Sequence, residues 1–428
     1  MTRSLRDALP AVALFDNYWA TTLALARSLG RRGVPLHIYG RGAGRWSRYC
    51  TRRATCPPPE NAGEFLPWLR ERVRSGEIAR VAPTTDLIAY YVSALREEFS
   101  PEVRRAIATL EEIENCLIKT RFSAVSALPG SAPLAIAAPE SVEGAVASAA
   151  ALGFPVMMKP KSHLVVGFDE RGRLLLNEAD VVRYFRRYDV FPGQDGIAAA
   201  YPELLWPLLQ RFIPSARHRV YSVSGVKDAD NGILTACVSY KREQWPPIVG
   251  VSTIQVSCEN PRILAAGVRI VNQVLSRGIF EVELLAEGDV LHAIDLNPRA
   301  FGFLELDMAR GFDLPWLWYR STIEPQMPLP PPEPQGSIEA QHRIMHITKA
   351  IARAPGLLGA QPYEERRDSS RPRRVVSMLG SWSDPLPLLV SNLHLLRHPR
   401  ALLRAQLAAP RKPRQPTLAS QPPGLTKK

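Results

Sequence analysis

The stretch from Gly278 to Phe301 constrains this chain more than any other, because its pattern is that of a two-faced β-hairpin. Two runs of alternating apolar and polar residues flank a polar turn around Gly288 and Asp289. Such alternation on both sides of a Gly-Asp turn is typical of paired antiparallel strands. We therefore predict a hairpin with one face in a core and the other face polar.

The expected pairing brings four polar side chains together. If the loop is the three residues 288–290, Glu283 lies opposite Asp295, and Glu281 lies opposite Asn297. A slip of one residue would send these side chains to opposite faces of the sheet, so the register is part of the prediction.

Carboxylate and amide oxygens on one face form the kind of site that Mg²⁺ prefers when phosphates fill its remaining positions. The alternative is an edge ribbon whose acidic face is solvated. Acidic residues are depleted from strands, and like charges opposite one another destabilise a sheet unless a cation neutralises them. The pattern favours the cation site and leaves the ribbon open.

Composition limits the class of protein. The 428 residues, 46% of them hydrophobic and 22% charged, are typical of a globular chain with two or three domains. No apolar run is long enough to span a bilayer, and residues 11–15 are too short for a signal-peptide core. The five cysteines have no metal-ligand spacing, so we expect reduced thiols in a cytoplasmic protein.

The net charge of +13 is concentrated at one end. Residues 331–428 hold 16 Lys or Arg and 6 Asp or Glu, a balance of +10, which leaves +3 for the first 330 residues. No nucleic-acid motif accompanies this basic segment, so we expect no nucleic-acid partner and at most weak contact with membrane surfaces.

The first part of the chain predicts a parallel α/β domain. Residues 11–40 have the order strand, helix, strand. The loop 16–19 lacks the G-x-G-x-x-G pattern, which disfavours a dinucleotide site. A helix at 64–74, a strand at 78–83 and a helix capped by residues 84–86 are expected to follow.

Five segments, taken in order, resemble the ATP-grasp superfamily, specifically its carboxylate–amine ligase branch, with a more distant similarity to biotin carboxylase. They are CLIKTRF, FPVMMKPK, LLQRFIPSARHRVYS, YKREQWPPIVGVSTI and EVELL…AIDLNPR, and the resemblance covers roughly residues 10–325. It implies a mixed α/β and α+β chain, with an ATP-grasp fold behind an N-terminal Rossmann-like domain. The expected divisions are a pre-ATP-grasp domain (1–117), an ATP-grasp domain (118–325, with a lid near 150–210 and a metal-binding base near 214–325), a Pro- and Arg-rich extension (326–409) and a disordered tail (410–428).

The resemblance implies a nucleotide site in which Lys119 and Lys159 contact phosphates. The backbone carbonyl of Arg211 and the N–H of Ile213 match the groups that read the adenine edge. Gln210 stands where family members often carry Glu, and it retains the ability to hydrogen-bond the nucleotide.

Further residues match by position around that site. His218 falls where carboxylase-like relatives have a histidine near the nucleotide, although a strand histidine is more often simply packed. The lid loop 162–173 has only two glycines, fewer than family lids usually carry.

The metal ligands implied by the resemblance are Glu283, Asp295 and Asn297. Asp295 departs from the usual Glu, and its shorter reach leaves open whether one or two Mg²⁺ (or Mn²⁺) ions bind. Arg299 matches the arginine expected to bind the substrate carboxylate or the transferring phosphoryl group. Lys241 and Arg242 are candidates for stabilising an acylphosphate, with a solvated basic pair as the alternative.

The implied activity is an ATP- and Mg²⁺-dependent ligase that activates a small carboxylate as an acylphosphate and joins it to an amine. A carboxylase-type enzyme is disfavoured because no biotin-carrier segment with Met-Lys-Met is present. A third interpretation is a non-catalytic nucleotide-binding protein that docks through its basic tail. A homodimer is compatible with the resemblance, and the sequence does not identify the substrates.

Overall fold

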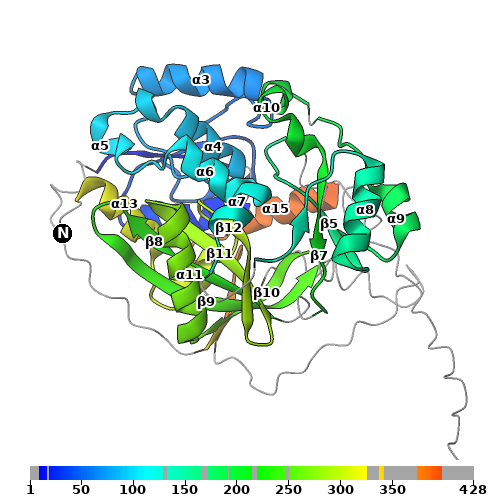
Figure 1. Ribbon diagram of the computed structural model, residues 1–428. Coiled ribbons are helices and arrows are strands. Elements are labelled where there is room, and N and C mark those ends of the chain that lie inside the picture. Colours follow the sequence, from blue (N-terminus) through cyan, green and yellow to red (C-terminus); the bar gives the residue numbers. More distant parts are fainter. Residues whose placement is uncertain are drawn as a thin grey trace, which may run out of the picture.

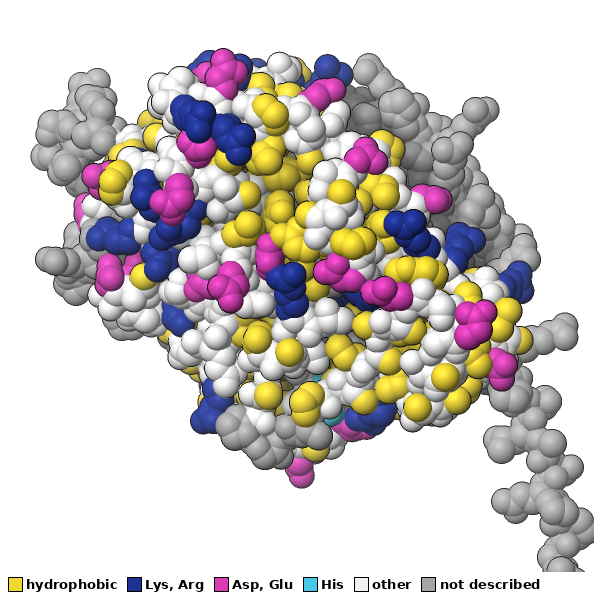
Figure 2. All heavy atoms as spheres, turned by 45° about the horizontal axis from the view of Figure 1, so that its top comes forward, with side chains coloured by type: hydrophobic (Ala, Val, Ile, Leu, Met, Phe, Trp, Pro, Cys, Tyr) yellow, Lys and Arg dark blue, Asp and Glu magenta, His cyan; other side chains and the backbone are white. Residues whose placement is uncertain are grey.

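Three β-sheets organise the chain (Figure 1). The computed structural model describes residues 9–16, 19–128, 133–165, 172–190, 192–214, 219–245, 250–324, 337–341 and 374–397. Figure 1 shows the N-terminal helices above the largest sheet, with the smaller sheet of β5 and β7 beside it. On the face in Figure 2, Lys and Arg side chains lie among Asp and Glu side chains, so that face presents no continuous basic patch.

The N-terminal unit has the predicted parallel order. Strands β1 (Val12–Phe15), β2 (Leu36–Tyr39) and β3 (Arg52–Ala54) form a parallel sheet, and α2 (Trp19–Arg31) connects the first two. The strand predicted at 78–83 is wrong in extent, because only Val81 pairs with the sheet, through a single bridge to Ala13. The following helices are α3 (Ala62–Arg74), α4 (Asp86–Ala94), α5 (Pro101–Arg104), α6 (Leu110–Leu117) and α7 (Lys119–Val125), with short 3₁₀ turns η1 (Ala43–Trp46) and η2 (Arg96–Glu98).

The smaller antiparallel sheet, here called the lid after the segment expected at 150–210, has its own core. Its strand order is β4 (Ile136–Ala137), β7 (Pro207–Arg211), β5 (Val156–Pro160), β6 (Arg173–Leu175). Helices α8 (Val142–Leu152) and α9 (Glu178–Tyr184) pack on it, followed by α10 (Asp195–Ala200) and η3 (Pro202–Leu205). The elements of this sheet begin at residue 136, before the range near 150–210 expected for a lid, and the domain divisions stay predictions.

The largest sheet carries the predicted hairpin near one edge. Its order is β12 (Val290–Asn297), β11 (Gly278–Glu287), β8 (Val220–Asp228), β9 (Gly232–Trp245), β10 (Val251–Cys258), β13 (Ile338–Gln341), β14 (Arg374–Ser377). All pairs are antiparallel except β13 with β14. Helix α11 (Pro261–Val274) packs against β8, β9 and β11. Helix α13 (Leu314–Ile323) also contacts β8 and β11, α12 (Leu304–Ala309) contacts β10, β13 and β14, and both pack against α2.

The N-terminal unit and the large sheet share two hydrophobic cores. In one core, Phe15 and Phe65 lie in the same buried cluster as Val282 on β11. In the other, Leu23 of α2 lies in the same cluster as Leu317 of α13. Because buried side chains fix these contacts, the N-terminal unit has a defined position over the hairpin.

The C-terminal segment 374–397 belongs to this body. Strand β14 extends the large sheet, and α15 (Leu386–Arg397) packs against η1. The large sheet therefore includes strands beyond residue 325, where the metal-binding base was expected to end, and the domain divisions stay predictions. The rest of the expected extension and the tail from 410 lie outside the described residues. In the part of the chain that the structure describes, no helix is both long and apolar enough to cross a membrane.

Candidate functional site

The hairpin has the predicted register at its two polar pairs, but its loop is one residue shorter than predicted and a bulge makes up the difference. Glu281 pairs with Asn297, and Glu283 pairs with Asp295. The loop is two residues long, since Glu287 already pairs with Val290. A bulge then shifts the register by one residue, because Glu283 opposes Asp295 while Leu284 opposes Ala293. The bulge restores the alignment that a three-residue loop would have produced.

The two faces of the hairpin differ as the alternation predicts. Val282, Leu284 and Leu296 are almost completely buried in the core that also holds α11. Their neighbours Glu283 and Asp295 point to the opposite face and remain partly exposed. Burial of the apolar face therefore fixes the two carboxylates next to each other.

Each carboxylate of this pair contacts a lysine from a different part of the fold. Lys119, the first residue of α7, donates to Asp295 Oδ1 at 2.9 Å. Lys241 of β9 lies 2.6 Å from Glu283 Oε1. Burial raises the pKa of Asp295, but the charges of Lys119 and Lys159 outweigh burial and leave that pKa below its usual value. The site is therefore a compact group of compensating charges.

Lys159 differs from the other two lysines because its hydrogen-bond partner is neutral. Its ammonium donates to Gln210 Oε1 at 3.2 Å, between neighbouring strands of the lid. Burial, together with the positive charge of Lys119, lowers the pKa of Lys159 to about 8. A buried cation without a contacting anion is costly, so this position favours an anionic ligand.

The predicted hinge residues lie where β7 ends. The N–H of Arg211 donates to the carbonyl of Ala135, and the Arg211 guanidinium binds both oxygens of Glu287, at 2.9 and 2.6 Å. This forked pair connects the lid to the end of β11. The Ile213 side chain is buried, and adenine binding by the backbone at these positions stays a prediction.

Two further parts of the predicted site lie wholly or partly outside the described residues. They are His218 and the lid-loop segment 166–171.

A second network starts at Glu281 and ends on the N-terminal unit. The Asn297 amide donates to Glu281 Oε2 at 3.1 Å, and its oxygen accepts from Arg299 Nη2 at 2.9 Å. Arg299 Nε donates to Asp86 Oδ1 at 2.6 Å. Burial and the nearby charge of Glu283 raise the pKa of Glu281 to about 7.

The contact between Asp86 and Arg299 was not predicted from the sequence. Thr85 caps α4 as predicted, since its hydroxyl accepts from the Ile88 N–H. This cap places Asp86 in the first turn, but the sequence contains no signal for an ion pair with a residue 213 positions away. The role of Glu281 in orienting Asn297 was also missed, although the predicted register already placed the two side chains opposite each other.

Arg242 lies apart from the other predicted site residues. It is the extra residue of a bulge in β9, because Lys241 pairs with Gln255 and Glu243 pairs with Ile254. Its guanidinium is 2.6 Å from Glu339, a buried residue of β13. The structure therefore does not bring Arg242 to Lys241 and Glu283, and its catalytic role stays a prediction without support from the geometry.

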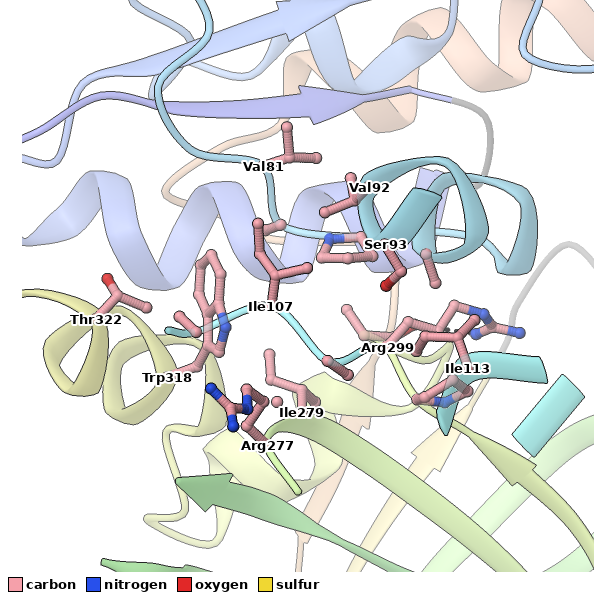
Figure 3. A pocket seen from close by; sticks show the side chains of 18 of the residues that line it. Val81, Val92, Ser93, Ile107, Ile113, Arg277, Ile279, Arg299, Trp318 and Thr322 are labelled. Carbon is pink, nitrogen blue, oxygen red and sulfur yellow. Dashed lines mark hydrogen bonds between the residues drawn. The ribbon is translucent and has the colours of Figure 1, made fainter. Parts of the chain in front are cut away.

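A small apolar cavity lies behind the turn that carries Arg299 (Figure 3). Its volume is about 50 Å³, and residues such as Val92, Ile107, Ile279 and Trp318 line it. Small-molecule sites usually measure about 300–1,000 Å³, so this cavity is too small for a nucleotide. Residues of α4 and of the turn 298–300 both line it.

The donor set of the hairpin suits a hard divalent cation. Glu283, Asp295 and Asn297 offer only oxygen ligands from this face, the chemistry that Mg²⁺ and Mn²⁺ favour. Within the described ranges, no group of three or more His, Cys, Asp and Glu side chains is arranged to hold a metal by itself. A cation here therefore requires further oxygens from a ligand such as a phosphate chain.

Comparison with known proteins decides the fold. No protein-family model and no curated protein matches the sequence. The structure is similar to the biotin carboxylase domain dimer of Hydrogenobacter thermophilus 2-oxoglutarate carboxylase, in complex with MgADP, ADP and bicarbonate. The TM-score is 0.59 at 14% identity, over 76% of this chain and 73% of the other.

Two ligase-type enzymes are also similar. One is an L-amino acid ligase from Bacillus licheniformis, with a TM-score of 0.54 at 12% identity, covering 77% and 78% of the two chains. The other is N5-carboxyaminoimidazole ribonucleotide synthetase from Thermus thermophilus, with a TM-score of 0.54 at 12% identity, covering 76% and 81%. The chain has the ATP-grasp fold. In this structure Lys119 and Lys241 contact the hairpin carboxylates, and Lys159 lies on β5 of the smaller sheet; their roles toward a nucleotide stay predictions.

Proposed function

We propose that this protein is an ATP-dependent ligase that activates a carboxylate as an acylphosphate and joins it to an amine. The observation that carries the proposal is the polar hairpin face, where Glu283 and Asp295 lie side by side beneath lysines from three separate elements. The similarity to an amino acid ligase and to a ribonucleotide synthetase supports the same class of reaction.

The charges of the site suit a bound triphosphate. Lys119 and Lys241 are paired with carboxylates, whereas Lys159 contacts only a neutral amide among its hydrogen-bond partners in the described residues. A phosphate oxygen would give Lys159 the anionic partner that it lacks. It would also compete with Asp295 and Glu283 for the other two lysines.

Glu283, Asp295 and Asn297 are the residues that would hold Mg²⁺ against the phosphates. When bound, the metal would supply positive charge that offsets the negative charge of the transferring phosphoryl group. A metal at Glu283 and Asp295 would compete with Lys241 and Lys119 for the same oxygens, and phosphate oxygens would offer these lysines new partners. We therefore infer that metal and nucleotide bind together.

The proposed reaction has two steps. An oxygen of the substrate carboxylate attacks the γ-phosphorus of ATP, a P–O bond forms, and the bond to the leaving ADP breaks. The amine then attacks the acyl carbon, phosphate leaves, and the nitrogen loses a proton as the C–N bond forms. Both steps develop charge on oxygen, so they depend on positioning and on fixed cations more than on covalent participation by the protein.

Arg299 is the residue best placed to orient the carboxylate. Asp86 and Asn297 bind two of its nitrogens and fix the plane of the guanidinium. A fixed guanidinium can bind a carboxylate or phosphoryl group through two parallel hydrogen bonds. Because Asp86 belongs to the N-terminal unit, the same contact ties this orientation to the position of that unit.

The test is release of ADP and phosphate from Mg-ATP with pools of amino acids and small carboxylates. We expect turnover only when a carboxylate and an amine are both present, and loss of turnover in Glu283→Ala and Asn297→Ala. The matched control is Asp289→Asn, which removes a carboxylate from the fully exposed turn of the same hairpin. Turnover with bicarbonate and no amine would identify a carboxylase-type enzyme instead, and nucleotide binding without turnover in any pool would favour a binding protein. A homodimer stays a prediction.

A further inference from the structure

The cavity behind the Arg299 turn lies between the N-terminal unit and the large sheet. Helix α4 and the segment 103–108 line it from the N-terminal unit, and the start of β11, the turn 298–300 and α13 line it from the other side. Figure 3 shows the side chains of Val92, Ile107 and Ile279 converging on this space from different elements. A molecule in the cavity would therefore contact both parts of the fold at once.

The charged side chains around the cavity all have the same sign. The described residues that line it include three arginines and no Asp or Glu. Two of these arginines already have partners. Arg299 donates to Asp86 and Asn297, and the Arg277 guanidinium donates to the carbonyl of Arg105. The third arginine, Arg80, is the cation with free capacity to bind an anion.

The Nε of Arg80 is buried and has no hydrogen-bond partner within the described residues. Burial lowers the pKa of Arg80, and the nearby Tyr319 and Glu102 offset that effect only in part. A buried donor without a partner is costly, and native structures rarely retain one without a reason. The position of Arg80 therefore favours an anionic group at the cavity.

The remaining wall limits what such an anion can carry. Val92, Ile107, Ile279 and Trp318 give the cavity an apolar lining, and its volume is about 50 Å³. Roughly 10–15 Å³ of such volume accommodates one water-sized group, so the cavity has room for about four of them. A hydrocarbon chain of about three or four carbons fits both the size and the polarity of this space.

We propose that this cavity binds a short-chain aliphatic carboxylate, whose carboxylate group pairs with Arg80 and whose hydrocarbon chain lies among Val92, Ile107 and Ile279. Inorganic phosphate would satisfy Arg80 but would leave the apolar wall without a partner. A long fatty acid would exceed the volume. The cavity is separate from the polar face of the hairpin, so this inference does not rest on the proposed reaction.

The experiment is calorimetric titration of the full chain, without nucleotide, with acetate, propionate, butyrate and octanoate at constant ionic strength. We expect binding to tighten about fourfold for each carbon added from acetate to butyrate, which is the effect of burying one methylene group. Octanoate should bind more weakly than butyrate because its chain exceeds the cavity. Butylamine, with the same apolar chain and the opposite charge, should not bind.

Two variants assign the binding to this cavity. Arg80→Gln should weaken butyrate binding about tenfold or more, because a hydrogen bond to a charged group contributes that much. The matched control is Arg41→Gln, which removes an exposed arginine elsewhere in the N-terminal unit and should leave binding unchanged. Val92→Phe should abolish binding, because Val92 is only 3% exposed and a larger side chain would occupy the cavity.

Several results would overturn the proposal. They are absence of butyrate binding, equal binding of butylamine, equal affinity for phosphate and butyrate, and equal binding by Arg80→Gln and Arg41→Gln. Loss of butyrate binding in Lys241→Met would place the carboxylate at the hairpin face and would also overturn it. Thermal unfolding shows whether each variant folds. Arg80 is partly exposed, so Arg80→Gln carries the test if Val92→Phe does not fold.

Discussion

Replacing Asp86 by asparagine removes the negative charge that faces the Arg299 guanidinium across the two halves of the protein. The two side chains are 2.6 Å apart, and only 11% and 14% of their surfaces are exposed. Asn keeps the size of Asp but offers Arg299 a neutral acceptor. The substitution therefore tests the ion pair itself without creating a cavity.

The expected cost follows from burial. Removing one partner of a buried ion pair typically costs about 3–5 kcal/mol because the remaining charge loses its compensation. Arg299 retains hydrogen bonds to the Asn297 oxygen and the Ala300 carbonyl, which places this pair below that range. We expect Asp86→Asn to lower the free energy of unfolding by about 2–3 kcal/mol, including the lost interaction with the α4 dipole.

Urea-induced unfolding of the purified chain measures this difference. Asp289→Asn, at the fully exposed hairpin turn, should leave the transition unchanged because exposed ion pairs contribute little. A double-mutant cycle with Arg299→Gln assigns the loss to the pair and not to either residue alone. A change below about 0.5 kcal/mol for Asp86→Asn would refute the reasoning, since substitutions without a structural role fall in that range.

Three further outcomes are expected. Burial holds the pKa of Lys159 at about 8, below its ordinary 10.5, so this group makes the free protein more stable as pH rises from 8 to 10.5. A phosphate partner should raise that pKa again, so ATP binding near pH 8–9 should be accompanied by proton uptake. Calorimetry in buffers of different ionisation enthalpy measures this uptake, which Lys159→Met should abolish. Gly267→Ala should destabilise the protein by about 1–3 kcal/mol in urea unfolding, because the new methyl group would lie 2.5 Å from the Val223 side chain, and an unchanged midpoint would contradict this packing. Asp384→Asn should remove one of the two carboxylates that pair with the buried Arg27, leaving Glu305, and should expose the C-terminal segment 374–397 to proteolysis; an unaltered digestion pattern would contradict this role of Asp384.

The hairpin register could be predicted because it depends on a local signal. Alternation of apolar and polar residues tells which side chains share a face, and burial of Val282 and Leu296 enforces that choice. The turn length was wrong by one residue, and the bulge before Leu284 compensates for it. Sequence patterns rarely locate a bulge, because the extra residue changes neither composition nor hydrophobicity.

The partners of the charged residues could not be predicted. Lys119 and Asp295 are 176 positions apart, and their contact depends on how α7 packs against β12. Arg242 and Lys241 are adjacent in sequence, yet a bulge and the neighbouring β13 give them different partners. Local spacing contains no information about such contacts, because they arise from the tertiary arrangement.

The C-terminal strands were missed for a related reason. Strand β14 is four residues long, Arg374–Ser377, and two of them are charged or polar. A segment this short has no period that distinguishes it from a loop. It forms a strand because β13 offers it an edge of the large sheet.

The central claim is that the polar face of the hairpin binds ATP together with a divalent cation. Calorimetric titration of ATP into the protein, with and without Mg²⁺, tests it most directly, using Glu283→Ala and the control Asp289→Asn. We expect tight binding that requires Mg²⁺ in the wild type and in Asp289→Asn, and at least about tenfold weaker binding in Glu283→Ala. Binding of ATP that is indifferent to both Mg²⁺ and Glu283, or absence of binding in the wild type, would contradict the claim.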